Sequence, residues 1–235
     1  MKTTLAITLA LGLAASLGAQ DTPPTVTASF YAFDYAPGLQ EVSIMVAGQA
    51  FEEITLSKAN IVGPIEAVLV DGNLTLHGAP VETGDEVTRP VVAAARIPDQ
   101  IINALVVVFP APESHRHAYN CLVLDHAAAD FPLGVYRMIN ASPFPVRGAM
   151  ARSIIEAKPG DIANLEPEGE PGTTVPVRFE YYENDRWNLL TETRSAIRDD
   201  RRWLVCIYQD ARTGRLNLRS IPDRSHLRQP SGGEE

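Results

Sequence analysis

The chain has 235 residues, of which 45% are hydrophobic and 21% charged, and its formal net charge is -9. This composition is that of a globular protein with one large or two small domains, and it excludes wholesale disorder. The excess of acidic residues excludes the nucleic-acid-binding proteins that depend on a basic face.

Residues 1–19 have the features of a secretory signal peptide. Lys2 supplies the positive end, residues 5–13 form a short apolar run, and small residues follow it up to Ala19. We predict cleavage after Ala19 and export to the periplasm, the cell envelope or the extracellular medium. The apolar run is too short to span a bilayer comfortably, so we expect the mature protein not to be membrane-spanning. The alternative is a buried N-terminal helix.

Short strands are expected throughout the first half of the mature chain. Between Val42 and Val46 every second residue is a branched apolar one, which is the pattern of a strand with one face in the core. Asp71-Gly72 is a tight-hairpin signal. DQIINAL (residues 99–105) is the best helix candidate, and a loop that leads into an apolar strand is the alternative. Further predicted strands are FEEITL, IEAVLV, NLTLHG, PVVAAARI, NALVVVF and YNCLVLD.

Residues 130–134 are predicted to be a hinge, after which VYRMINASP begins a second series of strands. The other strands predicted there lie in VRGAMARSIIEA, VPVRFEYYE, RWNLLTETRSAI, RRWLVCIYQD and RLNLRSI. The order of features repeats that of the first half. Near the end of each half a polar turn with Asp precedes a strongly apolar strand, a polar hairpin and a last strand that ends near Asp. FYAFDYAP and YRMINASP correspond at the front. We therefore predict an internal duplication of roughly 100 residues per unit.

These patterns predict an all-β fold made of two tandem immunoglobulin-like antiparallel β-sandwich repeats after the signal peptide. The first repeat comprises residues 20–129, the second comprises residues 130–223, and residues 224–235 form a flexible tail. The stretch YRMINASPFPVRG, with the exported start and the paired β-rich halves, resembles exported bacterial β-sandwich repeat proteins. That resemblance implies no activity and no site.

A metal site is one hypothesis for the histidines. His115 and His117 lie in the expected hairpin between two apolar strands, and on a strand they would share one face, with His126 as a further ligand. The alternative is a solvated hairpin tip. We favour the hairpin tip, because an isolated His-x-His pair is a weak signal.

A second hypothesis concerns aromatic residues of the second half. Tyr181, Tyr182 and Trp187 are the predicted ligand-binding residues, since rings exposed on a sandwich can stack on sugars. The alternative, which we favour, is that such rings fill the core. Trp187 follows the turn ENDR and is the ring that we expect to be most exposed.

No catalytic residue and no cofactor is indicated. Adjacent acidic pairs such as Glu52-Glu53 and Asp199-Asp200 are poor candidates, because neighbouring residues on a strand point to opposite faces. No nucleophile-elbow, phosphate-loop or HExxH motif occurs in the sequence.

The two cysteines, Cys121 and Cys206, both lie in apolar runs. An oxidising compartment would permit a disulfide between them. The apolar surroundings favour buried free thiols instead.

The first functional hypothesis is an exported, non-enzymatic envelope or secreted protein that acts as a structural or binding module for a protein or a glycan. The alternatives are a carbohydrate-binding module and a metal-dependent hydrolase that uses the His115/His117 hairpin. The sequence leaves the ligand and the oligomeric state open.

Overall fold

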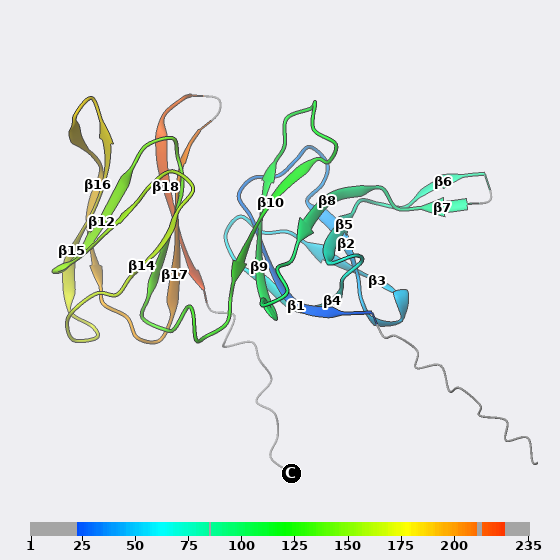
Figure 1. Ribbon diagram of the computed structural model, residues 1–235, viewed down its shortest axis with the longest axis horizontal. Helices are drawn as coiled ribbons and strands as arrows, with labels where there is room; N and C mark the ends of the chain where they lie inside the picture. The colour runs from blue at the N-terminus through cyan, green and yellow to red at the C-terminus, as the bar shows by residue number, and fades with distance from the viewer. Residues whose placement is uncertain (1–22, 85, 211–212, 224–235) are drawn as a thin grey trace, which may run out of the picture.

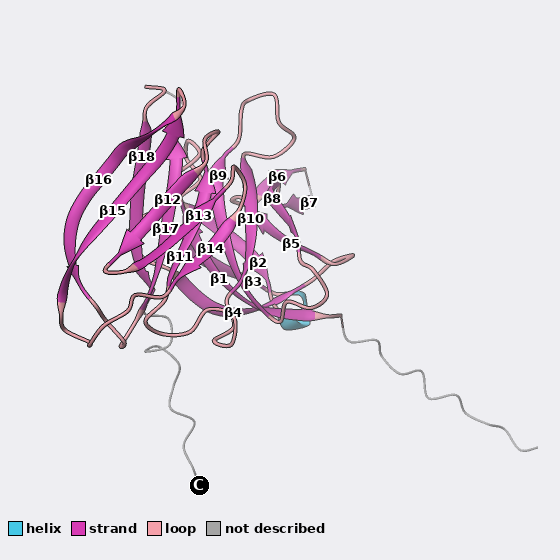
Figure 2. Ribbon diagram, turned by 60° about the vertical axis from the view of Figure 1, so that its left-hand side comes forward, coloured by secondary structure: helices cyan, strands magenta, loops and turns pink. Residues whose placement is uncertain are grey.

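The computed structural model describes residues 23–84, 86–210 and 213–223. Within these ranges the chain is all-β, as predicted, with one short 3-10 turn, η1 (Ala47–Gln49), and no α-helix (Figures 1 and 2). No helix in the described ranges has the length and hydropathy that crossing a bilayer requires. The signal peptide predicted at residues 1–19 and the tail predicted at residues 224–235 lie outside the described residues.

The first half of the chain forms two four-stranded sheets, with the strand orders β10-β9-β1-β4 and β3-β2-β5-β8. Two short strands, β6 and β7, pair with each other and extend from the β5–β8 hairpin as a projecting ribbon (Figure 1). The bounds are β1 (Thr25–Ala32), β2 (Glu41–Met45), β3 (Phe51–Thr55), β4 (Val62–Val68), β5 (Asn73–His77), β6 (Val81–Thr83), β7 (Glu86–Thr88), β8 (Val91–Arg96), β9 (Asn103–Pro110) and β10 (Tyr119–Asp125).

The second half forms two more four-stranded sheets, with the orders β14-β11-β17-β18 and β13-β12-β15-β16. The bounds are β11 (Tyr136–Ala141), β12 (Val146–Met150), β13 (Ser153–Ala157), β14 (Ile162–Leu165), β15 (Thr174–Glu183), β16 (Arg186–Ala196), β17 (Arg202–Gln209) and β18 (Leu216–Asp223). The strand orders of the two halves correspond when β1 is matched to β11 and β9 to β17. The sheet β10-β9-β1-β4 then matches β18-β17-β11-β14, and the sheet β3-β2-β5-β8 matches β13-β12-β15-β16.

Each half contains one parallel strand pair. In the first half β1 runs parallel to β9, with Ala28 opposite Ala104, and in the second β11 runs parallel to β17, with Tyr136 opposite Trp203. The other pairings between described strands are antiparallel. A parallel pair needs a long crossover, and here the crossover is most of the half itself. This pair joins the first strand of each half to its second-to-last strand.

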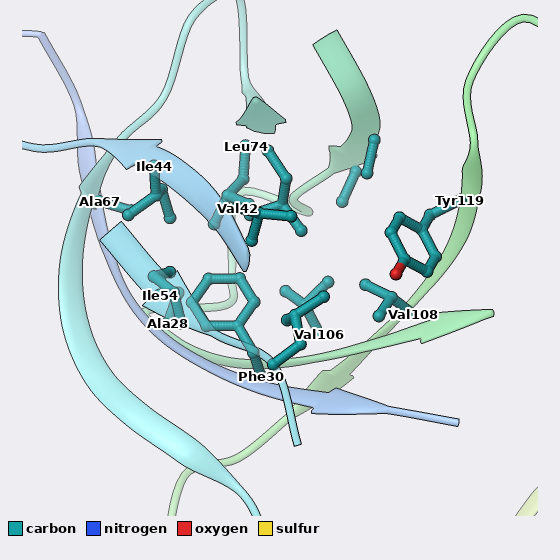
Figure 3. Packing of buried hydrophobic residues seen from close by; sticks show 14 of the residues in the cluster. Ala28, Phe30, Val42, Ile44, Ile54, Ala67, Leu74, Val106, Val108 and Tyr119 are labelled. Atoms are coloured by element: carbon teal, nitrogen blue, oxygen red, sulfur yellow. The ribbon is translucent and has the colours of Figure 1, made fainter. Parts of the chain in front are cut away.

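Three hydrophobic clusters hold the structure together, and two of them are internal to one half. The first lies between the two sheets of the first half and includes Phe30, Val42, Ile44 and Val106 (Figure 3). The second lies between the two sheets of the second half and is built around Met138, Val146, Met150, Phe179 and Ile207. Each pair of sheets therefore packs as a sandwich with a core of its own.

The third cluster lies between the halves. It joins the outer face of sheet β10-β9-β1-β4 to the outer face of sheet β14-β11-β17-β18. Its buried members are Tyr31, Phe33, Ile61, Leu105, Val107, Leu124, Ile139, Leu204, Cys206 and Ile221. Strand β9 is buried on both faces as a result, and no residue from Leu105 to Val108 is more than 1% exposed. Double-sided burial explains why the sequence shows a continuous apolar run there instead of alternation.

The interface between the halves has an aromatic end and a polar end. At the aromatic end the ring centroid of Phe33 lies 5.0 Å from that of Phe109 and 4.2 Å from that of Tyr208. At the polar end β9 begins with Asn103 and β17 begins with Arg202. The N-terminal ends of β9 and β17 lie at this same end of the interface, and Asn103 and Arg202 line one cleft there.

The segment DQIINAL is a turn and not a helix. The amide of Ile101 donates a hydrogen bond to the carbonyl of Pro98 at 2.9 Å, and β9 begins at Asn103. Of the two interpretations of this segment, the loop that leads into a strand is the one that the structure has.

Both cysteines are free thiols. Cys206 is buried in the cluster between the halves and Cys121 is partly buried beside the first core. Burial raises the pKa of each thiol to about 12. Very little thiolate therefore exists near neutral pH, and thiolate is the reactive form.

We predict that a disulfide-exchange reagent at pH 8 reacts at least about 100-fold more slowly with the native protein than with protein unfolded in guanidinium chloride. In the unfolded chain both cysteines should react without prior reduction and release two equivalents of thionitrobenzoate. The absorbance of released thionitrobenzoate measures both. A rapidly reacting native thiol, or no thiol after unfolding, would contradict the assignment.

Candidate functional site

The candidate site is a cleft of about 310 Å³ at the polar end of the interface between the halves. The first half, the connection between β10 and β11, and β17 all contribute to it. The lining residues are Thr27, Ser29, Pro64, Asn103, His126, Ala127, Ala128, Phe131, Leu133 and Arg202.

The alternation of side chains along β1 directs two polar residues into the wall of the cleft. Ala28 and Phe30 point into the first core, so Thr27 and Ser29 point to the outer face of the same strand. Thr27 is the cross-strand partner of Asn103 on β9. The amide of His126 donates to the carbonyl of Asn103 at 2.9 Å, which continues the row past the end of β10.

Asp223 anchors the polar end. Its side chain is 0% exposed, and its Oδ2 atom accepts hydrogen bonds from His126 Nε2 and from Arg202 Nε, each at 2.6 Å. Arg202 and Asp223 are cross-strand partners in the second half, whereas His126 belongs to the end of the first. A carboxylate is very unfavourable in the interior unless charged or polar donors hold it. The bond to His126 therefore ties the two halves together.

Two buried arginines hold the connection between the halves in place. Arg202 Nη1 donates to the carbonyl of Phe131 at 2.6 Å, and Arg137 donates to the carbonyls of Asp125 and Asp130. The guanidinium carbons lie over the Phe131 ring, 4.4 Å from its centroid for Arg137 and 4.7 Å for Arg202. Burial lowers the pKa of Arg137, and the nearby charge of Arg202 lowers it further. The predicted hinge at residues 130–134 thus has a buried anchor, Phe131.

Ser29 is one of the polar groups of the cleft wall that have no partner in the described chain. It is 3% exposed, and its hydroxyl forms no hydrogen bond with another residue in the described part of the chain. Gly63 on β4 crosses directly beside it with φ at +112°. A Cβ atom at Gly63 would lie 2.8 Å from the carbonyl oxygen of Ala28 and 3.3 Å from Ser29 Oγ. Glycine at this position lets β4 approach without displacing the serine.

The structure does not bring the three predicted metal ligands together. His115 and His117 lie in the loop between β9 and β10, where His115 Nδ1 is 3.1 Å from the carbonyl oxygen of His117. His126 follows the other end of β10, which has seven residues. At about 3.3 Å per residue the separation is on the order of 20 Å. No group of three or more His, Cys, Asp or Glu residues in the described ranges could hold a metal ion.

The predicted aromatic residues lie on two different faces. Tyr182 and Trp187 are partners on the outer face of sheet β13-β12-β15-β16, with ring centroids 5.4 Å apart and planes at 61°. The guanidinium carbon of Arg147 lies 4.3 Å from the centroid of Trp187 and covers that ring. Tyr181 points the other way, beside Phe144, into a second hollow of about 350 Å³. The three rings therefore do not form one coplanar platform.

Glu180 organises the charges on this outer face. Although it is only 6% exposed, it accepts hydrogen bonds from Arg147 Nε and from Arg178 Nη2, the latter at 2.7 Å. The bond from Arg147 is the main reason why the pKa of Glu180 lies below its usual range, and Arg178 adds to it. Arg147 thus both binds Glu180 and covers Trp187.

Sequence reasoning missed most of the cleft. His126 was singled out, but as a metal ligand, and Ser29, Asn103, Arg202 and Asp223 were not. One signal was present: a polar residue directly precedes each of the two longest apolar runs, Asn103 before ALVVVF and Arg202 before WLVCIY. Because the two apolar strands correspond in the two halves, this signal would have indicated that Asn103 and Arg202 lie at the same end of the interface.

Comparison with known proteins assigns no family: no protein-family model matches the chain, and no curated protein sequence matches it. The resemblance suggested by YRMINASPFPVRG stays a prediction. The chemistry of the cleft is accordingly derived from its own residues.

The Glu180 network makes stability depend on pH. Because its pKa in the folded state is lowered, Glu180 stabilises the fold fully above the unfolded-state value of 4.5, and this contribution is lost as the pH falls through the folded-state value. We predict that Glu180→Gln lowers the free energy of unfolding by about 2 kcal/mol at pH 7, and that the difference from the wild type shrinks on acidification below pH 4.5.

Urea unfolding followed by circular dichroism measures these free energies. Glu192→Gln is the matched control, because Glu192 forms a more exposed pair with Arg178 at 3.5 Å and its loss should cost less than about 1 kcal/mol. A Glu180→Gln effect that grows on acidification, or that is absent at pH 7, would contradict the account.

Proposed function

We propose that this chain is an exported, non-enzymatic binding module, built from two tandem immunoglobulin-like β-sandwiches, whose ligand occupies the cleft between them. The proposal combines the signal peptide expected at residues 1–19 with the geometry of the cleft. The single observation that carries it is a row of polar side chains, Thr27, Ser29 and Asn103, that line a space of about 310 Å³ and have no side-chain hydrogen bond to another described residue. A ligand or water would supply the hydrogen-bonding partners of this row.

The position of the cleft also supports a binding role. Ligand sites occur preferentially where two structural units meet, because both contribute walls. The third hydrophobic cluster fixes the halves against each other, and Asp223 and Phe131 fix the walls at the cleft itself. The site is therefore preorganised, which lowers the entropy cost of binding.

The proposal includes a tandem duplication of one sandwich unit. Two features support it: the strand orders of the halves correspond, and the equivalent sheet of each half packs against that of the other. Equivalent faces can meet in this way when two copies are related by a two-fold rotation, as in a symmetric dimer. We infer that the chain contains two copies of one sandwich unit joined through the residue 130–134 connection.

The other two candidate functions receive less support from the geometry. A metal-dependent hydrolase would need the three histidines to converge, and about the length of β10 separates His126 from the other two. A sugar-binding platform would need exposed rings in one plane, whereas the Tyr182 and Trp187 planes meet at 61° and Arg147 lies over one face of Trp187. We therefore assign the binding role to the cleft between the halves.

We predict that filling the cleft abolishes binding. Ala128 lines the cleft and is exposed, so Ala128→Tyr should block the space without disturbing a core. A library of small polar molecules is screened against the wild type by saturation-transfer NMR. Hits should lose at least about tenfold in affinity with Ala128→Tyr.

Ala59→Tyr is the matched control, because Ala59 is also exposed but lies in the loop between β3 and β4, outside the cleft lining. This variant should bind like the wild type. If no library member binds in a manner that Ala128→Tyr weakens, the proposed function is wrong.

We further predict that the exported protein begins at Gln20. Mass spectrometry of the protein from the extracytoplasmic fraction of an expressing bacterium measures the mature mass. Leu9→Arg interrupts the apolar run and should retain the protein in the cytoplasm, whereas Thr4→Arg adds charge before the run and should permit export. Recovery of the wild type in the cytoplasm with residues 1–19 intact would contradict export.

A further inference from the structure

Arg202 and His126 in the cleft wall already bind other groups of the protein. Arg202 uses Nε for Asp223 and Nη1 for the carbonyl of Phe131, and its guanidinium lies over the Phe131 ring. His126 uses Nε2 for Asp223. The buried carboxylate of Asp223 thus binds both side chains, and it already supplies the negative charge that offsets the Arg202 guanidinium.

Apart from the remaining N–H groups of Arg202, the groups left over are uncharged. They are the hydroxyls of Thr27 and Ser29 and the carboxamide of Asn103, none of which forms a side-chain hydrogen bond with another described residue. Each can donate and accept a hydrogen bond. The hydroxyl groups of a ligand also donate and accept hydrogen bonds. They could therefore pair with these three side chains without leaving a charge unpaired.

A charged ligand fits this wall less well. An anion would have to share Arg202 with the buried carboxylate of Asp223, whose charge already offsets that of the guanidinium. A cation would lie beside Arg202 and His126 and would find no carboxylate among the lining residues. Both arguments favour a neutral ligand.

Apolar groups complete the wall. Pro64 and Leu133 both line the cleft, and Leu133 is 46% exposed. Carbon-bound hydrogens on the ring of a sugar can pack against such side chains while the hydroxyls reach the polar row. A cleft of about 310 Å³ lies at the lower end of the size range of small-molecule sites, which suits one ring rather than a long chain.

We propose that the cleft binds a neutral polyhydroxylated ligand, a single sugar ring, through Thr27, Ser29 and Asn103. This inference rests on the proposed function and names its ligand class. The site differs from the aromatic patch at Tyr182 and Trp187 and does not depend on ring stacking.

The experiment measures binding of D-glucose, D-galactose, D-mannose and N-acetyl-D-glucosamine to the mature protein by saturation-transfer NMR and by calorimetry. Two charged relatives of glucose, D-glucuronate and D-glucosamine, are measured at the same pH. We expect at least one neutral sugar to bind with a dissociation constant in the millimolar range or tighter, and its charged relatives to bind at least about tenfold more weakly.

Variants locate the binding. Ser29→Ala and Thr27→Val each remove one hydroxyl, and Thr27→Val is isosteric at an exposed position, so loss of folding is not the expected cause of its effect. Each should weaken binding of the neutral sugar about tenfold. Ser220→Ala removes an exposed hydroxyl from β18, outside the cleft lining, and should leave binding unchanged.

The outcomes separate the inference from the proposed function. If only a charged ligand or another library member binds, and Ala128→Tyr and Ser29→Ala both weaken it, the ligand class is wrong and the binding site stands. If a neutral sugar binds but Ala128→Tyr, Ser29→Ala and Thr27→Val leave its affinity unchanged, it binds elsewhere and the inference is overturned. If nothing binds in a manner that Ala128→Tyr weakens, the inference falls together with the proposed function.

Discussion

The structure depends on the burial of two outer sheet faces against each other. A sandwich needs only its inner faces to be apolar, yet Leu105, Val107, Leu204 and Cys206 extend the apolar surface to the outer faces of β9 and β17. Exposed, these faces would be a large apolar patch; packed together they form a third core. Full burial of a leucine or valine side chain contributes about 1.5–3 kcal/mol, so we expect the halves to unfold together.

The polar end of this interface sets the position of the cleft. A carboxylate inside the protein needs donors, and Asp223 finds one in its own half, Arg202, and one in the other half, His126. This arrangement joins the two halves at the polar end of their interface. The charge of Asp223 also offsets that of Arg202, and the rest of the wall includes hydroxyl and amide groups. In the proposed function, the same interactions that join the halves therefore influence the kind of ligand that the cleft binds.

Local pattern was sufficient for the all-β class and for many strands, because period-two alternation and turn residues act within a few positions of the chain. It was not sufficient for the packing of the halves. The runs ALVVVF and WLVCIY do not alternate, and only the third cluster explains why both faces are apolar. His126 and Asp223 are 97 residues apart, so their contact follows from that packing and from no local signal. Neighbouring residues on a strand point to opposite faces, so Tyr181 and Tyr182 cannot belong to one aromatic patch. Grouping them because both are aromatic ignores this alternation.

Equilibrium unfolding of the full chain tests the shared core most directly. Both tryptophans, Trp187 and Trp203, lie in the second half, so their fluorescence reports on that half, while far-ultraviolet circular dichroism reports on all the sheets. The account predicts coincident urea transitions for the wild type. It predicts separated, lowered transitions for Leu204→Ser, which places a hydroxyl in the third core. Separate transitions in the wild type, or an unchanged midpoint in the variant, would contradict it.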